Sequence, residues 1–175
     1  MRPFTRIIIF CAVAALAASL PGGVCAQSAF PKPGGPVNDF ADVITPPYEK
    51  KIGNIAKELT GKTGVALFVV TVPNVEGAGA DEYAERLYKD WGIGTKGSDK
   101  GILILVSVRE RKLHVRVGAD LEAHLSQRQI EEIQGRFVVP YLRQNNYDAG
   151  LFNGVVAIAK IIAEESGVTL EEIVP

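Results

Sequence analysis

Cysteine is almost absent from this sequence. Only Cys11 and Cys25 occur among its 175 residues. Everything after Cys25 therefore lacks a thiol, which excludes a disulfide framework, thiol catalysis and a thiolate metal site from the rest of the chain. Histidine is also scarce, because the chain holds only His114 and His124. Two imidazoles offer too few nitrogen ligands for zinc, and we expect both at the surface.

The sequence also lacks an excess of basic charge. Nineteen Lys and Arg residues face twenty Asp and Glu residues, so the formal net charge is −1. A surface that binds nucleic acid would be basic, so the composition argues against a nucleic-acid partner.

Long hydrophobic runs are confined to the amino terminus. The apolar segment 7–20 follows Arg2 and Arg6 and ends at Pro21-Gly22-Gly23. It falls short of the roughly 20 residues that cross a bilayer, and its layout is typical of a secretory signal peptide. We therefore predict a signal peptide over 1–26, cleaved near Ala26, and export to the periplasm or the medium. In an alternative reading Cys25 is kept as a lipidated amino terminus, although Val24 before it fits that processing poorly.

The remaining chain is expected to hold one domain and no transmembrane segment. Residues 27–36 are rich in Pro and Gly and predict an extended arm. The domain is placed at 37–168, and a short tail at 169–175. Apolar runs at 65–72 and 102–108 predict two central strands that are covered on both faces.

The spacing of apolar residues predicts the remaining helices and strands and so the order of elements. Helices are predicted after Thr45, at 80–91, after Ser126 and from position 147, and an alternating strand at 113–117. The order αβαββαα predicts an α/β fold, a three-layer α/β/α domain with a short mixed sheet. Ile130, Ile133 and Phe137 should be buried, and His114 and Arg116 should lie on an exposed strand face.

The loop between the second helix and the second strand contains the pattern G-x-G-x-x-G at Gly92, Gly94 and Gly97. A dinucleotide-binding loop follows a strand and opens a helix, whereas this loop follows a helix and opens a strand. Ser98 also stands where a phosphate-binding loop needs lysine. We therefore predict no nucleotide site. The glycines are expected to form a tight turn, which leaves Asp99 unexplained.

Several short motifs, taken in order, resemble those of the TPM domain family, which includes thylakoid-lumen, photosystem II repair and bacterial exported proteins. They are Val37-Asn38-Asp39-Phe40-Ala41, Tyr83-Ala84, Trp91-Gly92-Ile93-Gly94, Asp99-Lys100-Gly101-Ile102-Leu103-Ile104, Val117-Gly118 before Leu121-Glu122, Pro140-Tyr141, and Tyr147 with Gly150. The resemblance implies binding of Ca²⁺ or Mg²⁺ through an acidic cluster. For plant members it implies acid phosphatase activity.

Carried over position by position, Asp39 and Asp99 match recurring acids of the family, and Asp42 is a weaker candidate ligand. Backbone carbonyls and water could complete a site for a hard cation. Such a site requires the loops that hold Asp39 and Asp99 to converge at one end of the sheet. The alternative is that Asp39 and Asp42 cap the approach to the first helix and Asp99 forms an Asx turn.

Two functions remain open at this stage. The first is a cation-binding adaptor that assists maintenance of envelope or membrane proteins. The second is a weak metal-dependent acid phosphatase. The pair Asp39 and Asp42 has the spacing D-x-x-D, whereas an aspartate nucleophile would be expected in a D-x-D arrangement. No serine nucleophile in a G-x-S-x-G motif occurs either. Phosphatase chemistry would therefore depend on a metal-activated water.

Overall fold

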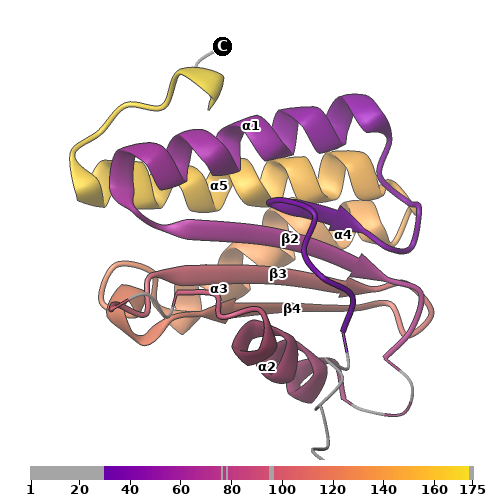
Figure 1. Ribbon diagram of the computed structural model, residues 1–175. Coiled ribbons are helices and arrows are strands. Elements are labelled where there is room, and N and C mark those ends of the chain that lie inside the picture. Colours follow the sequence, from indigo (N-terminus) through magenta and orange to yellow (C-terminus); the bar gives the residue numbers. More distant parts are fainter. Residues whose placement is uncertain (1–29, 76, 78, 95–96, 174–175) are drawn as a thin grey trace, which may run out of the picture.

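The computed structural model describes residues 30–75, 77, 79–94 and 97–173. The predicted signal peptide at 1–26 and its cleavage point lie outside the described residues. The sheet has four strands in the order β1 (Val37–Asp39), β2 (Ala66–Val72), β3 (Gly101–Ser107) and β4 (Lys112–Val117). The first three strands run parallel and β4 is antiparallel to β3, which confirms the mixed sheet (Figure 1).

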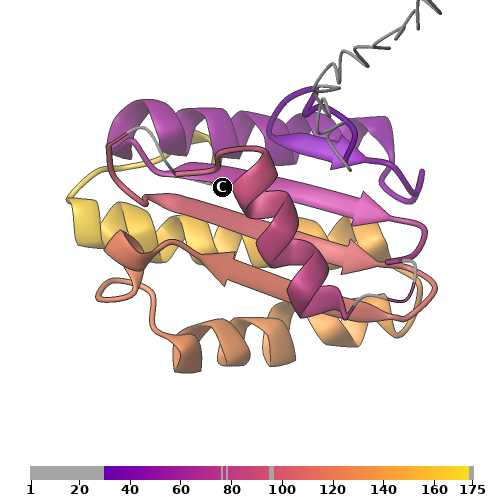
Figure 2. The same ribbon diagram turned by 60° about the horizontal axis from the view of Figure 1, so that its bottom comes forward.

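Helices cover both faces of this sheet. Helix α1 (Pro46–Thr63) and helix α5 (Tyr147–Ser166) lie on one face, and α2 (Ala80–Asp90) lies on the other (Figures 1 and 2). After β4 come η1 (Ala119–Leu121), α3 (Gln127–Ile133), the π-helix η2 (Gln134–Val138) and α4 (Val139–Leu142), and η3 (Glu171–Ile173) follows α5. The three-layer α/β/α prediction is confirmed.

Strand β3 is the centre of the core, and all seven of its residues are buried. Ile102, Ile104 and Val106 face α1 and α5. Leu103 and Leu105 face α2. A strand covered on both sides has no polar face, which explains why its sequence is a continuous apolar run.

Strand β1 was not predicted as a strand. It has three residues, too few for a period-two pattern, and it reads Val-Asn-Asp. Tertiary pairing creates it instead, because the Val69 amide donates to the Pro36 carbonyl and the Phe40 amide donates to the Thr71 carbonyl.

The predicted helix starts are confirmed. Thr45 precedes α1 with a proline in its first positions, and Ser126 and Gln129 form a capping box at α3. Gly150 and Gly154 in α5 also allow close packing. A Cβ on Gly154 would lie 2.6 Å from Cγ2 of Val138, so α5 packs tightly on η2.

Two burial predictions are wrong. Phe137 is 38% exposed, and Val138 is buried instead. The π-helix η2 explains the change, because its wider turn rotates the following side chains relative to a regular α-helix. His114 and Arg116 do not face open solvent, because α2 covers that face. His114 Nδ1 lies 2.6 Å from Asp81 Oδ1, and Arg116 Nε lies 2.8 Å from Glu85 Oε2.

Within the described ranges, none of the helices combines the length and the apolar character needed to cross a bilayer.

Candidate functional site

The predicted ligands Asp39 and Asp99 lie at opposite ends of the sheet. Asp39 pairs with Thr71 near the carboxyl end of β2, whereas Gly101, two residues after Asp99, pairs with Ala66 at the amino end. The stretch of β2 between these positions corresponds to roughly 16 Å at the usual rise per residue. The two loops therefore do not converge on one cation. The reason is that β1 runs parallel to β2 and carries Asp39 away from the start of β3.

Asp99 is held in place by the structure around it. Its Oδ1 accepts a hydrogen bond of 2.5 Å from the hydroxyl of Tyr88, and its Oδ2 accepts one of 2.9 Å from the Ala119 amide. The Asp99 amide in turn donates to Asp120 at 2.9 Å. Asp99 thus ties the end of α2, the glycine loop and the segment after β4 together.

Three glycines make room for this contact. A Cβ on Gly94 would lie 2.7 Å from Oδ1 of Asp99, and a Cβ on Gly101 would overlap the Tyr88 hydroxyl. A Cβ on Gly118 would overlap the carbonyl oxygen of Asp99. Gly94 also has φ +81°, a conformation that favours glycine. The loop joins the end of α2 to the start of β3, as the sequence predicted. Of its glycines Gly94 packs against Asp99 and Tyr88, whereas Gly97 has open space around it.

The contacts of Asp99 favour its ionised form. Burial opposes ionisation of the carboxyl, but hydrogen bonds from Tyr88 and Ala119 and the charge of Arg116 together lower the pKa of Asp99 below 3.8. Burial, followed by the bond to Asp99, raises the pKa of the Tyr88 phenol. Tyr88 therefore stays protonated and donates to an ionised Asp99 across the physiological pH range.

This arrangement predicts a specific acid sensitivity. Because the pKa of Asp99 is lower in the folded state than its ordinary value, its stabilising effect is present above about pH 4 and is lost as the pH falls through the native pKa. We expect Asp99→Asn to cost about 2 kcal/mol in free energy of unfolding at pH 7 and less at pH 2.5. Urea unfolding at both pH values measures the difference. Glu82→Gln, on the exposed side of α2, serves as the control. An equal cost at both pH values would refute the assigned role.

Asp39 closes the turn that leads into α1. Its Oδ2 accepts hydrogen bonds from the amides of Val43 at 2.8 Å and Ile44 at 2.7 Å. Its Oδ1 accepts a hydrogen bond from the hydroxyl of Thr71. Asp39 therefore caps the approach to α1, which is the structural role that the sequence left open as an alternative.

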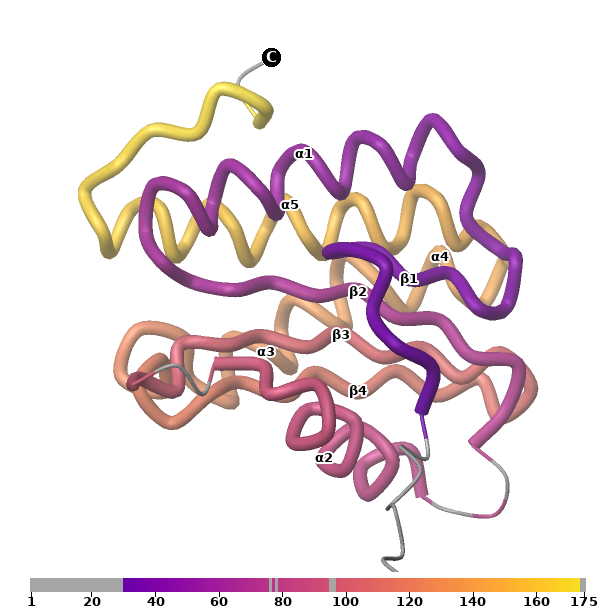
Figure 3. The backbone as a smooth tube through the Cα atoms, viewed as in Figure 1, coloured from indigo at the N-terminus to yellow at the C-terminus, as the bar shows by residue number. Residues whose placement is uncertain are grey.

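A second carboxylate reaches the same turn from the other end of the chain. Asp148, at the start of α5, accepts from the Thr45 amide at 2.7 Å and from the Thr45 hydroxyl at 2.8 Å. Successive amides of the turn are thus bound by β1 and by α5, whose first residues lie beside the start of α1 (Figure 3).

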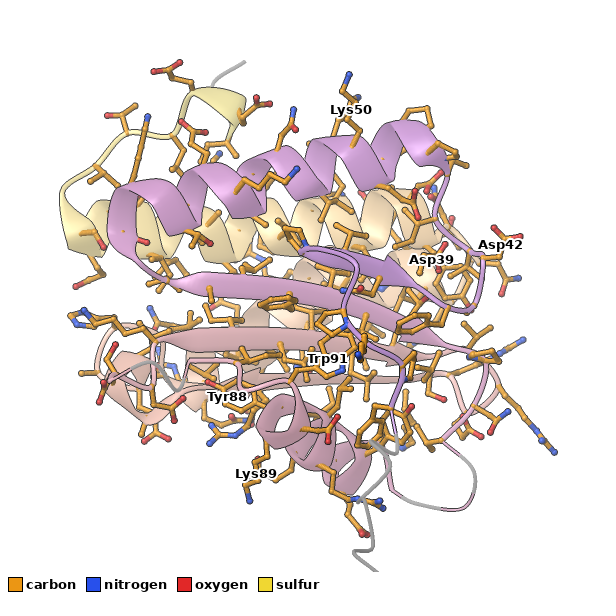
Figure 4. All side chains as sticks on the ribbon, viewed as in Figure 1. Asp39, Asp42, Lys50, Tyr88, Lys89 and Trp91 are labelled. Atoms are coloured by element: carbon orange, nitrogen blue, oxygen red, sulfur yellow. The ribbon has the colours of Figure 1, made fainter. Side chains whose placement is uncertain are left out.

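Two further acids complete this corner of the molecule. Asp42 is exposed, with φ +54°, and its side chain points outward (Figure 4). Glu49 lies in the first turn of α1, where burial, followed by the charges of Asp39 and Asp42, raises the pKa of its carboxyl. We call Asp39, Asp42, Glu49 and Asp148 the acidic edge. None of the four forms an ion pair with a lysine or arginine of the described chain.

The acidic edge offers hard oxygen ligands and no imidazole or thiol. The described residues nevertheless contain no ready group of three or more His, Cys, Asp or Glu side chains that could hold a metal ion. Of the three predicted ligands, the structure brings Asp39 and Asp42 together and leaves Asp99 apart. Glu49 and Asp148 were not predicted from the sequence as members of this site. A first-turn acid four residues after a helix cap could have indicated Glu49, but no local signal links Asp148 to Thr45.

Comparison with known proteins agrees with this fold. The N-terminal domain of a Porphyromonas protein ("P.gingivalis") superposes with a TM-score of 0.71 at 23% sequence identity, covering 77% of this chain and 86% of that one. BA42 from Bizionia argentinensis gives a TM-score of 0.60 at 14% identity, covering 75% and 93%. The N-terminal domain of cg2496 from Corynebacterium glutamicum gives 0.57 at 14%, covering 79% and 84%. No curated protein matches the sequence.

These structural likenesses establish the fold, and the sequence adds the family. The profile of the TPM domain matches residues 37–161, which is most of the chain and includes every strand and the glycine loop. The match also contains the acidic edge and the Asp99 contacts. The chain belongs to the TPM domain family.

Proposed function

We propose that this domain binds a divalent cation, Ca²⁺ or Mg²⁺, at the acidic edge, and that it serves as an exported adaptor module for envelope or membrane proteins. The observation that supports the cation proposal is the proximity of Asp39 and Asp42 to Glu49, whose pKa is raised by burial and then by their charges, with Asp148 bound at the same turn. None of these acids forms an ion pair with a lysine or arginine of the described residues. The export that this role requires rests on the sequence of residues 1–26.

The electrostatics of Glu49 give the physical reason. Burial and the nearby charges of Asp39 and Asp42 raise its pKa, so its ionised form costs free energy in the folded protein. The positive end of α1 offsets part of this repulsion. A divalent cation would offset more of it, because it interacts with several carboxylates at once.

Ligand counting sets the expected affinity. Asp42 and Glu49 have oxygens that no described hydrogen bond occupies, and a carboxylate that already accepts one bond keeps further lone pairs. Hydration water and backbone carbonyls would have to supply the rest of a six- to eight-oxygen shell. Because no cage is preformed, we expect weak binding, with a Kd of about 10⁻⁴ to 10⁻³ M.

Removing two of the carboxylates should remove the response to cation. At ten times Kd, Ca²⁺ should raise the free energy of unfolding by about 1.4 kcal/mol, which raises Tm by a few degrees. We expect the double variant Asp42→Asn with Glu49→Gln to show no such rise.

The pKa of Glu49 adds a second signature. A carboxyl whose pKa is raised by folding contributes its stability below its ordinary pKa of 4.5, and that stability is lost as the pH rises. Glu49→Gln should therefore be more stable than the parent at pH 7 in the absence of cation. Melting curves with and without Ca²⁺ or Mg²⁺ measure both effects, with Glu82→Gln as the matched control. Unchanged melting of the parent at 10 mM Ca²⁺, or a rise that persists in the double variant, would refute the site.

The phosphatase alternative is tested with the same proteins. No observation at the acidic edge favours a nucleophile there, so the alternative depends on a cation-activated water. Turnover of a chromogenic phosphate ester that disappears in the double variant would support it. Turnover that survives in the variant would identify a contaminant.

A further inference from the structure

The outer edge of β4 is open. The Gly118 amide donates to the Gly101 carbonyl, and the strands pair Leu103 with Arg116 and Leu105 with His114. In an antiparallel ladder the hydrogen-bonded pairs alternate, so the backbone groups of Leu113, Val115 and Val117 point away from β3. No described hydrogen bond engages these groups. The edge therefore presents the N–H and C=O groups of three alternate residues of β4 for pairing with another strand.

The helix layer reaches beyond this edge. Helix α3 and the π-helix η2 pack on α5, while β4 packs on β3 and α2. Figure 2 shows α3 and the segment after it lying past β4, on the side away from β3. We call the helical segment α3, η2 and α4 the shelf. A cleft of about 390 Å³ lies between β4 and the shelf. Its lining includes Leu113, Val139, Leu142, Tyr147, Arg111 and Arg143.

The cleft is apolar at its base and basic at its rim. Arg111 and Arg143 are exposed, and neither forms an ion pair with an acid of the described chain. No Asp or Glu lines the cleft. The shelf also contains the π-helix, whose residue Gln134 faces the cleft. π-bulges of this kind are frequent at functional sites.

We propose that an extended segment of a partner protein adds to β4 as a fifth strand. An apolar side chain of that segment fills the cleft, and a neighbouring Asp or Glu binds Arg111 and Arg143. Backbone hydrogen bonds to Val115 and its outward-facing neighbours supply affinity, and the cleft supplies specificity. This inference does not depend on cation binding, and it gives the adaptor role a partner of defined chemistry.

A second copy of the chain fits this edge less well. The strand Lys112–Val117 carries Lys, His and Arg but no acid, so it could not neutralise the two arginines. A second copy would also bring its own shelf to a space that is bordered by the first shelf. A bare peptide strand has neither obstacle.

Selection of peptides tests the proposal. The full chain is used to select from a phage-displayed library of random peptides. We expect enriched sequences that alternate apolar residues and contain Asp or Glu. Val115→Pro removes an outward N–H, a change that edge strands tolerate, and should weaken these peptides about tenfold. Arg111→Glu with Arg143→Glu should lose the acidic peptides and select Lys-containing ones, whereas Arg128→Glu, outside the cleft, should change nothing.

A measurement on the parent protein tests the same proposal without requiring that any variant folds. Binding of a selected peptide should slow amide hydrogen exchange at Leu113, Val115 and Val117. Peptides that bind the parent and Val115→Pro equally, or that keep their affinity after the double charge reversal, would overturn the proposal. A concentration-dependent dimer that protects the same three amides would also overturn it, in favour of self-pairing.

Discussion

Replacement of Gly118 by alanine is expected to lower the free energy of unfolding by about 3 kcal/mol. A Cβ at this position would overlap the carbonyl oxygen of Asp99 and would lie 2.6 Å from its Oδ1. The carbonyl oxygen belongs to the backbone, and the carboxyl group is held by the Tyr88 hydroxyl and the Ala119 amide, so neither atom can easily move away. The end of β4 would have to move away from the start of β3, which disturbs the pairing of β4 with the fully buried strand β3.

The matched control is Gly61→Ala. Gly61 lies in α1, and a Cβ there meets nothing within 4 Å. Alanine favours a helix more than glycine does, so Gly61→Ala should raise stability by up to about 1 kcal/mol. Urea unfolding of the two variants should give changes of opposite sign. If Gly118→Ala unfolds like the parent, the tight packing around Asp99 is wrong.

Replacement of Asp39 by alanine is expected to cost about 3 kcal/mol. The change leaves the amides of Val43 and Ile44 and the hydroxyl of Thr71 without their carboxylate partner. Hydrogen bonds to a charged group are worth more than neutral ones, and three are lost together. Asp42→Asn, only three residues away, should change stability by less than about 0.5 kcal/mol because its side chain is exposed and asparagine tolerates the same positive φ.

Denaturant unfolding of both variants separates structure from ligand binding. A small cost for Asp39→Ala, or a large cost for Asp42→Asn, would contradict the roles that the structure gives them. The comparison also defines how a cation site should be probed. Asp42 and Glu49 can be altered without removing the hydrogen bonds that close the turn, whereas loss of binding in an Asp39 variant could reflect a displaced loop.

The sequence was most informative where one element buries two faces. The apolar runs of β2 and β3 identified central strands because such strands need helices on both sides. The order helix, glycine loop, strand was also predicted correctly, since the loop lies between α2 and β3. The family resemblance is confirmed by the match over residues 37–161.

The sequence was least informative where distant segments determine a local structure. Strand β1 exists through its pairing with β2. The π-helix η2 packs against α5, a contact that its own residues do not reveal. The expected convergence of Asp39 and Asp99 was wrong because the direction of β1 was not visible in three residues. Asp148 could not be assigned to the site from the sequence, because only the fold brings it to Thr45, from which it is distant in sequence.

Asp99 and the acidic edge thus have different roles. Asp99 joins three segments at the amino end of β3, with both carboxylate oxygens bound inside the molecule. The acidic edge lies at the carboxyl end of β1, and the side chain of Asp42 there faces solvent. The glycine loop, which carries the most conspicuous sequence pattern, supports the fold, and the less conspicuous turn before α1 is the candidate binding site.

A titration of the isotope-labelled chain with Ca²⁺, followed by amide chemical shifts, tests this division most directly. We predict saturable shifts at residues 39–49 and 147–149, with a Kd of about 10⁻⁴ to 10⁻³ M, and no comparable shifts at 97–101 or 118–120. The shifts should vanish in the double variant Asp42→Asn with Glu49→Gln. Saturable shifts centred on Asp99, or no saturable shift at the acidic edge, would contradict the account.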